Sequence, residues 1–263
     1  MKITNIKVGS DPELFIVNSS NNKVVSSIGL IPGEKGKAYR GPGMTKGYGL
    51  QIDNVLAEFN IPATNKKDKF IASMNFMKNY IRNFVKETNP DYDIQCIASR
   101  DVDEDQLQHP IAKLFGCDVS YNAYTEDENP KPDGERGSLR SAGCHIHLSY
   151  KYPNARTSID LIKYLDMYLG IPSVVFDPDT RRRTLYGKAG DFRLKAYGVE
   201  YRSLSSFMMS SDEMLDFVWE GIQKAIRAYN LGVPLIDSEV VQKTINNSDV
   251  ETAKKLIKDY NLV

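Results

Sequence analysis

Charged side chains recur at every second position within short apolar segments of this chain. The segment "SDPELF" places Asp11 and Glu13 two residues apart, and "VEYRSL" does the same with Glu200 and Arg202. In a β-strand, residues i and i+2 lie on one face of the sheet. The pattern therefore predicts strands that present acids and cations on one face, with apolar residues packed on the other.

The segment "SAGCHIHLSY", residues 141–150, holds two of the chain's three histidines. As a strand it puts His145 and His147 on one face, where two imidazoles suit a metal ion or a phosphate. Two polar residues on a solvated strand face are the alternative. The run "DNVLAEFN" adds Asp53 and Glu58. Five positions apart, these two share a strand face only if a bulge intervenes, which leaves open whether Asp53 is in the site.

Strand-like and helix-like segments are interspersed without regular strand–helix–strand alternation, which favours an α+β fold with a mostly antiparallel sheet. Apolar residues at helical spacing predict a helix over 66–88, and a Thr/Ser start with Gly170 as its stop predicts another over 157–170. The remaining expectations are strands at 5–9, 13–17, 24–28, 92–99 and 191–206, the last turning near residue 197, and helices from 211 to 263.

Two turn-rich segments are predicted to be mobile loops that close over bound substrates. Residues 29–49 contain seven of the 18 glycines, and residues 124–140 are polar and rich in turn-forming residues.

Composition and missing motifs narrow the function. The 34 basic residues are balanced by 34 acidic ones, so we expect no nucleic-acid partner. No apolar run approaches the ~18–20 residues of a membrane span, and the start lacks the apolar stretch of a secretory signal. Three scattered cysteines suit a reducing cytosol, so a cytoplasmic protein is expected. The sequence carries no P-loop, Rossmann or nucleophile-elbow motif.

Taken in order, "GSDPELF", an acidic strand, "AGCHIHLS", an arginine-rich segment and "VEYR" resemble the glutamine synthetase / glutamate–cysteine ligase superfamily. The nearest likeness is to its small amidoligases, the carboxylate–amine ligases of phages and bacteria, and it covers roughly residues 8–207. The resemblance implies a curved, mostly antiparallel sheet with helices on its outer face. We expect residues 1–210 to form the catalytic domain and residues 211–263 a helical segment packed on it. If the chain is phage-encoded, its location is the host cytoplasm.

The resemblance also implies roles for individual residues. Asp11 stands where the family usually has Glu, which shortens its reach by one methylene. The expected metal ligands, for Mg²⁺ or Mn²⁺, are Glu13, Asp11, Glu58, His145 and Glu200. The residues expected to bind the nucleotide are His147, Arg183 and Lys188, and those expected to act in catalysis are Arg193, Arg202 and Glu58.

The activity implied is the ATP-dependent joining of a small-molecule or peptide carboxylate to an amine through an acyl phosphate. Phosphoryl transfer needs positioning and charge neutralisation more than a covalent nucleophile, which suits these residue types. Two alternatives use the same acids and histidines: a metal-dependent hydrolase or phosphoesterase, and an inactive relative that binds nucleotide. The sequence indicates neither the two substrates nor the oligomeric state.

Overall fold

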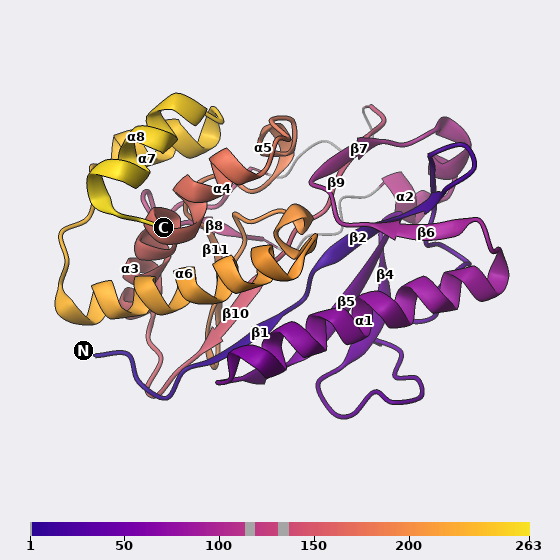
Figure 1. Ribbon diagram of the computed structural model, residues 1–263, viewed down its shortest axis with the longest axis horizontal. Coiled ribbons are helices and arrows are strands. Elements are labelled where there is room, and N and C mark those ends of the chain that lie inside the picture. The colour runs from indigo at the N-terminus through magenta and orange to yellow at the C-terminus, as the bar shows by residue number, and fades with distance from the viewer. Residues whose placement is uncertain (1, 114–118, 131–136) are drawn as a thin grey trace.

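A ten-stranded sheet forms the centre of the molecule (Figure 1). The computed structural model describes residues 2–113, 119–130 and 137–263. The ten strands are β1 (Lys7–Ser10), β2 (Glu13–Asn18), β3 (Lys23–Val25), β4 (Gly49–Asp53), β5 (Leu56–Thr64), β6 (Tyr92–Gln95), β8 (Tyr121–Asn122), β10 (Ile146–Ser149), β11 (Asp191–Lys195) and β12 (Gly198–Tyr201). A separate pair consists of β7 (Ser99–Asp101) and β9 (Leu139–Ser141).

The strand order explains which segments of the chain meet. The path is β3–β2–β5–β1–β10–β12–β11–β8, with β4 paired to β5 and β6 paired to β2. Each of these strand pairs is antiparallel. The N-terminal strand β1 is therefore central and lies next to β10, which comes from the middle of the chain.

Helices cover one face of the sheet (Figure 1). The helices of the described residues are α1 (Lys67–Thr88), α2 (Pro110–Lys113), α3 (Ala155–Leu165), α4 (Ile171–Phe176), α5 (Arg182–Leu185), α6 (Asp212–Leu231), α7 (Ser238–Asn246) and α8 (Val250–Tyr260), with a π-helical turn at Asp166–Gly170 and 3₁₀ turns at Glu104–Leu107 and Ser206–Met209. Of these, α1 packs on β5 and β6, α3 on β11 and β12, and α6 on both α1 and α3. Within the described ranges, none of the helices combines the length and apolarity needed to cross a membrane.

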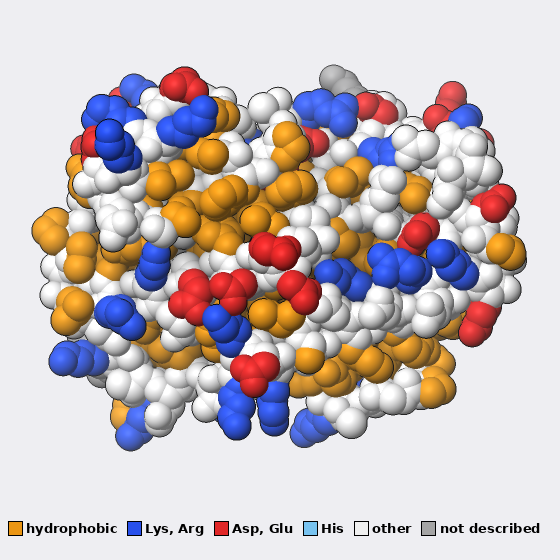
Figure 2. All heavy atoms as spheres, in the orientation of Figure 1, with side chains coloured by type: hydrophobic (Ala, Val, Ile, Leu, Met, Phe, Trp, Pro, Cys, Tyr) orange, Lys and Arg blue, Asp and Glu red, His pale blue; other side chains and the backbone are white. Residues whose placement is uncertain are grey.

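Alternation along the strands separates an apolar face from a polar one. Leu14 and Tyr201 are fully buried and belong to the same core cluster as the inner side of α1. Their neighbours in the chain, Glu13 and Glu200, leave the sheet on the opposite face. Figure 2 shows the helix-covered side, where exposed apolar side chains border acidic and basic ones. The predicted α+β fold, with a mostly antiparallel sheet, is confirmed.

The helix expected over 157–170 has different ends. It begins at Ala155 and passes through the π-helical turn directly into α4, so Gly170 does not stop it. A Cβ added at Gly170 would lie 2.8 Å from Ile245 Cδ1. This glycine therefore allows close packing of α7 against the helix instead of ending the helix.

Residues 49–64 form a hairpin of β4 and β5. Asn54 adopts φ +57° in the turn, a conformation that Asn tolerates well. Gln51 lies opposite Glu58, and Asp53 lies two residues from Gln51 on the same strand. Asp53 and Glu58 therefore share a face from two different strands, and the bulge considered from the sequence is not needed.

The strand expected over 141–150 is interrupted. β9 ends at residue 141 and β10 begins at residue 146, so His145 lies just before a strand. Between them, Gly143 forms an isolated bridge with Ser205.

The segment 29–49 is irregular, but its base is fixed. The backbones of Tyr39 and Leu50 exchange hydrogen bonds of 2.7 and 2.9 Å. The Tyr48 hydroxyl lies 2.8 Å from Ser73 Oγ on α1. Residues 131–136 of the other expected loop, 124–140, lie outside the described residues. The mobility of both loops stays a prediction.

Candidate active site

Adjacent strands place polar residues in a row across the sheet. His147 of β10 lies opposite Gly9 of β1 and opposite Glu200 of β12. Arg193 of β11 lies opposite Glu200 on the other side. Since directly opposed residues in an antiparallel pair share a face, these side chains leave the sheet together, away from the helices.

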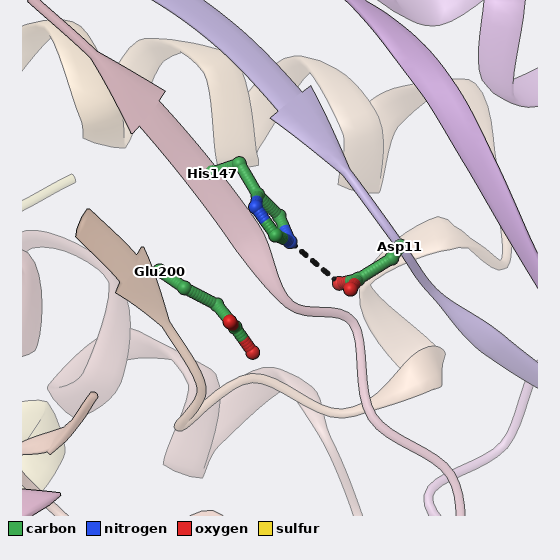
Figure 3. A group of neighbouring side chains, drawn as sticks. All are labelled: Asp11, His147 and Glu200. Atoms are coloured by element: carbon green, nitrogen blue, oxygen red, sulfur yellow. Dashed lines mark ion pairs between the residues drawn. The ribbon is translucent and has the colours of Figure 1, made fainter. Parts of the chain in front are cut away.

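Asp11, His147 and Glu200 converge within this row (Figure 3). One nitrogen or oxygen from each residue lies within 4.8 Å of those of the other two. His147 Nε2 is 2.8 Å from Asp11 Oδ1, and the other ring nitrogen is hydrogen-bonded to the Tyr197 hydroxyl. The three side chains come from separate segments of the chain and offer an imidazole and two carboxylates to one point.

Burial and neighbouring charges shift the pKa values of the carboxylates in this group in opposite directions. Burial raises the pKa of Asp11, but the charges of His147 and His145 and their hydrogen bonds outweigh it and hold the pKa well below its ordinary value. Burial likewise opposes ionisation of Glu200, but the Arg202 charge helps to lower its pKa to about 2. Both carboxylates are therefore ionised at neutral pH, which is the form that binds a cation.

A second group of acids lies where β2, β4 and β5 meet. Glu13 lies opposite Glu58 in the register, and its Oε2 accepts a 2.7 Å hydrogen bond from the Gly143 amide. Glu58 accepts one of 2.9 Å from Gln51. Burial, followed by the charge of Asp53, raises the pKa of Glu13 to about 8. Burial and the neighbouring carboxylates also raise that of Glu58. So many buried acids favour a cation among them.

His145 stands beside both groups of acids. Its Nδ1 is 3.4 Å from Asp11 Oδ1 and 3.8 Å from Glu200 Oε1. A Cβ added at Gly143 would lie 2.5 Å from His145 Nε2, so the glycine leaves room for the ring. The converging trio contains His147, which we expected at the phosphates, and not His145, which we expected on the metal. Both assignments stay predictions.

Three cations surround Glu200, which is fully buried. Arg202 Nη1 forms a close ion pair with Glu200 Oε1, and Arg193 Nη1 is 3.2 Å from the same oxygen. Lys195 Nζ is 2.7 Å from Oε2. Arg202 Nε also lies 3.7 Å from Asp191 Oδ1. Sequence reasoning selected the two arginines and missed Lys195, although strand alternation from residue 193 would have found it.

The three consecutive arginines 181–183 reach three different places. Arg181 is exposed and pairs with Asp101. Arg183, expected at the nucleotide, donates instead to the Ser173 hydroxyl among the helices. Lys188, also expected there, is exposed. The structure brings neither Arg183 nor Lys188 to the acids and histidines.

Arg182, which sequence reasoning did not select, is the member of the run that reaches the site. It is buried, and its Nη1 donates a 3.0 Å hydrogen bond to the Ser203 carbonyl. Gly187 has φ +73°, and a Cβ there would lie 1.4 Å from Nη1. A Cβ at Gly143 would lie 3.2 Å from Nη2. Two glycines, one of them distant in the sequence, therefore make room for this guanidinium, and no local pattern in the sequence indicated it.

Two cavities open at these groups. The smaller one, about 30 Å³, is called here the central cavity, and Glu13, His145, Arg182 and Arg202 are among the residues lining it. Acids and guanidinium groups therefore share one small space.

The larger cavity, about 830 Å³, is called here the basic cavity. Its wall includes His147 and Tyr197 from the row, and Lys37, Arg40 and Lys46 from the irregular segment 29–49. Among the described residues no carboxylate lines it. A site with three cations and no acid suits a ligand with several negative charges, and it lies directly beside His147.

The donor set fits a hard divalent cation. Carboxylate oxygens with one imidazole suit Mg²⁺ or Mn²⁺. Asp11 Oδ1 and Glu200 Oε2 are buried, and His147 and Lys195 are their close neighbours in the described part of the chain. A divalent cation at these oxygens would have to displace or tolerate these two neighbours.

One part of the chain is similar to a known protein family. No curated protein matches the chain. Residues 138–224 match the family model described as phage phiEco32-like COOH.NH2 ligase-type 2. The matched part carries His145, His147, Arg182, Glu200 and Arg202, while Asp11, Glu13 and Glu58 lie outside it. The match confirms the resemblance to the amidoligases: over these residues the chain is similar to a family of ligases that join a carboxylate to an amine.

Proposed function

We propose that this protein is an ATP-dependent carboxylate–amine ligase that forms an amide through an acyl phosphate. The observation that carries the proposal is the row of ionised acids, histidines and guanidinium groups beside a large cavity lined by cations. The family match supports ligation of a carboxylate to an amine. The row adds the residue types that phosphoryl transfer requires.

The basic cavity would bind ATP. Its three cations would hold the phosphates, and its volume of about 830 Å³ is in the range of small-molecule sites. Mg²⁺ or Mn²⁺, when bound, would neutralise charge on the phosphates. Asp11, His147 and Glu200 would hold that ion, with the second group of acids able to hold another.

The guanidinium groups of the central cavity would act on the other substrate. Arg182 and Arg202 offer paired N–H donors to a carboxylate and then to the acyl phosphate formed from it. Their burial keeps water away from this intermediate, which water would otherwise hydrolyse. The role of these residues is to orient the substrate and to stabilise charge.

The test uses hydroxylamine as the amine, because it converts acyl phosphates into hydroxamates. Purified protein with Mg²⁺ and ATP is incubated with pools of carboxylic acids, with and without hydroxylamine, and ADP and hydroxamate are measured. We expect ADP to be released only when a carboxylate is present. With hydroxylamine, the amount of ADP released should equal the amount of hydroxamate formed. The substitutions Glu200→Gln and His145→Ala should each lower the rate of ADP release at least 100-fold. Glu239→Gln, at an exposed position, should leave that rate unchanged.

Two outcomes would refute the proposal. Turnover without ATP would indicate a hydrolase that uses the same acids. The absence of ADP release with every acid pool and amine, despite normal ATP binding, would indicate an inactive nucleotide-binding relative. Melting curves of the variants separate lost chemistry from lost folding.

A further inference from the structure

A third cavity, of about 620 Å³, lies at the turn between β4 and β5. Three segments line it: residues 28–35, the turn at Ile52–Asn54, and the pair His109 and Ile111 at α2. It shares no lining residue with the basic cavity. A ligand in this cavity would therefore not compete for space with one in the basic cavity.

The wall of this cavity is mainly hydrocarbon, and we call it the apolar cavity. Its apolar side chains are Ile28, Ile31, Pro32, Ile52 and Ile111. Ile111 is 47% exposed, a large fraction for an isoleucine beside a cavity. An apolar ligand would cover it and gain the free energy of removing that surface from water.

Asp53 joins the apolar cavity to the central cavity. It is half-buried, and both cavities are lined by Asp53 and Asn54. The turn is held in place, because Asn54 Oδ1 accepts hydrogen bonds from the Val55 amide and from Arg140 Nε. The turn that carries Asp53 is therefore held in place where it lines both the apolar cavity and the central cavity.

The charged side chains of the two cavities favour different substrates. The guanidinium groups of Arg182 and Arg202 lie in the central cavity. The side chains that line the apolar cavity include two carboxylates, Glu34 and Asp53, and one ammonium, Lys35. A carboxylate is favoured at the first place and an ammonium at the second.

We propose that the apolar cavity binds the amine substrate, a primary amine that carries an apolar group of benzyl size or larger. The hydrocarbon lies against the isoleucines, and the ammonium lies against Asp53, aimed into the central cavity. This inference rests on the proposed ligase function and names the substrate class of that site.

The bond-forming step balances with this placement. The amine nitrogen, after losing one proton to solvent, attacks the carbonyl carbon of the acyl phosphate. The C–N bond forms, and the C–O bond to phosphate breaks with its electron pair leaving on phosphate. The remaining surplus proton on nitrogen goes to the departing phosphate. Asp53 orients the ammonium before attack, while the hydrocarbon wall excludes water from the path.

The test measures binding without turnover, using benzylammonium as the probe and the full chain without ATP. Isothermal titration is run on wild type, Asp53→Asn and Ile111→Asn. Leu235→Asn is the control because Leu235 is 42% exposed, similar to Ile111, and lies between α6 and α7. Benzoate and methylammonium test the charge and the hydrocarbon separately.

We expect benzylammonium to bind wild type and Leu235→Asn with equal affinity. It should bind Asp53→Asn at least tenfold more weakly than wild type, and Ile111→Asn at least fivefold more weakly. Benzoate and methylammonium should each bind at least tenfold more weakly than benzylammonium. No binding of benzylammonium, equal binding of benzoate, or an unchanged affinity in either cavity variant would overturn the inference. Hydroxamate formation in the assay above, together with such a result, would leave the ligase function standing and refute only the amine class.

Discussion

Among the side chains of the site, Glu200 is the one that most charged groups contact. It is fully buried, yet two arginines and Lys195 contact its two oxygens. A divalent cation shared with Asp11 would have to displace or tolerate these neighbours. The three cations therefore compete with a metal ion for Glu200, and the most exposed of the three, Lys195, is the easiest to remove.

Lys195→Met should strengthen divalent-cation binding. Removing an ammonium 2.7 Å from Glu200 Oε2 removes a repulsion worth about 1 kcal/mol, which corresponds to roughly fivefold in affinity. Mn²⁺ binding without nucleotide, followed by paramagnetic resonance, measures this. Lys243→Met, which removes an exposed pair with Glu239, should change nothing. Weaker Mn²⁺ binding in Lys195→Met would contradict the idea of competition.

Single residues of the site were predictable where strand geometry decides them. Alternation placed Glu200 with Arg202, because that rule is local, whereas Asp11 lies between β1 and β2 and joins a different group from Glu13. Alternation could not select Arg182 from three arginines. Successive residues of a helical turn point about 100° apart, and the partner of each comes from elsewhere in the chain.

At the scale of elements, the segment 29–49 supplies all three cations of the basic cavity. It approaches the sheet closely at Gly33, where φ is +90° and an added Cβ would lie 2.1 Å from the Leu50 carbonyl oxygen. Gly36 has a similar φ of +81° but nothing within 4 Å of an added Cβ. The two glycines separate the effect of close approach from the effect of backbone strain.

Gly33→Ala should weaken ATP binding at least tenfold, because the base of the segment must shift away from β4. Gly36→Ala should weaken ATP binding less than threefold, because it adds backbone strain of about 1–2 kcal/mol but brings no atoms into collision. Titration with the non-hydrolysable analogue of ATP measures both affinities. Hydrogen exchange at Tyr39 and Leu50 should accelerate in Gly33→Ala alone. Equal effects of the two substitutions would show that strain, and not the position of the segment, sets the affinity.

The elements themselves were largely predictable, and the errors have identifiable causes. Periodicity gave the helix over 66–88 and the hairpin of β11 and β12. The helix near 157–170 was assigned a wrong end because glycine commonly ends helices, whereas Gly170 is required by the neighbouring Ile245. That contact is tertiary and leaves no local pattern.

At the scale of the whole molecule, hydrogen bonds to Asp166 connect several segments of the chain. Its carboxylate accepts hydrogen bonds from the Tyr201 and Tyr124 hydroxyls at 2.7 and 3.0 Å and from the Gly190 amide at 2.6 Å. Burial raises its pKa to about 7 despite these donors. The folded state therefore holds a proton on Asp166 that the unfolded chain, with an ordinary pKa of 3.8, releases.

Stability should consequently fall as pH rises between these two values. The unfolded state binds fewer protons there, so the free energy of unfolding decreases with pH. Between pH 5 and pH 7 the wild type should lose about 2 kcal/mol more than Asp166→Asn, which has no such proton. Urea unfolding of both proteins at the two pH values measures the difference. Parallel pH dependence of wild type and variant would show that Asp166 is ionised in the fold.

The overall α+β architecture followed from interspersed strands and helices, but the strand order did not. Nothing local indicates that β1 pairs with β10 and β5, or that the second acid group and the row belong to one face. The order depends on which apolar surfaces fit together, and that is a property of the complete fold.

The pairing of β1 with β10 has a consequence for how the protein forms in the cell. Ser10 meets Ile146, so the first strand leaves the ribosome long before its partner is made. At typical rates of synthesis the wait is on the order of ten seconds. During this time β1 is a strand with a free edge, open to pairing with other chains. Assembly of the row that joins Asp11 to Glu200 must therefore be a late event of folding, since it cannot precede the synthesis of β10 and β12.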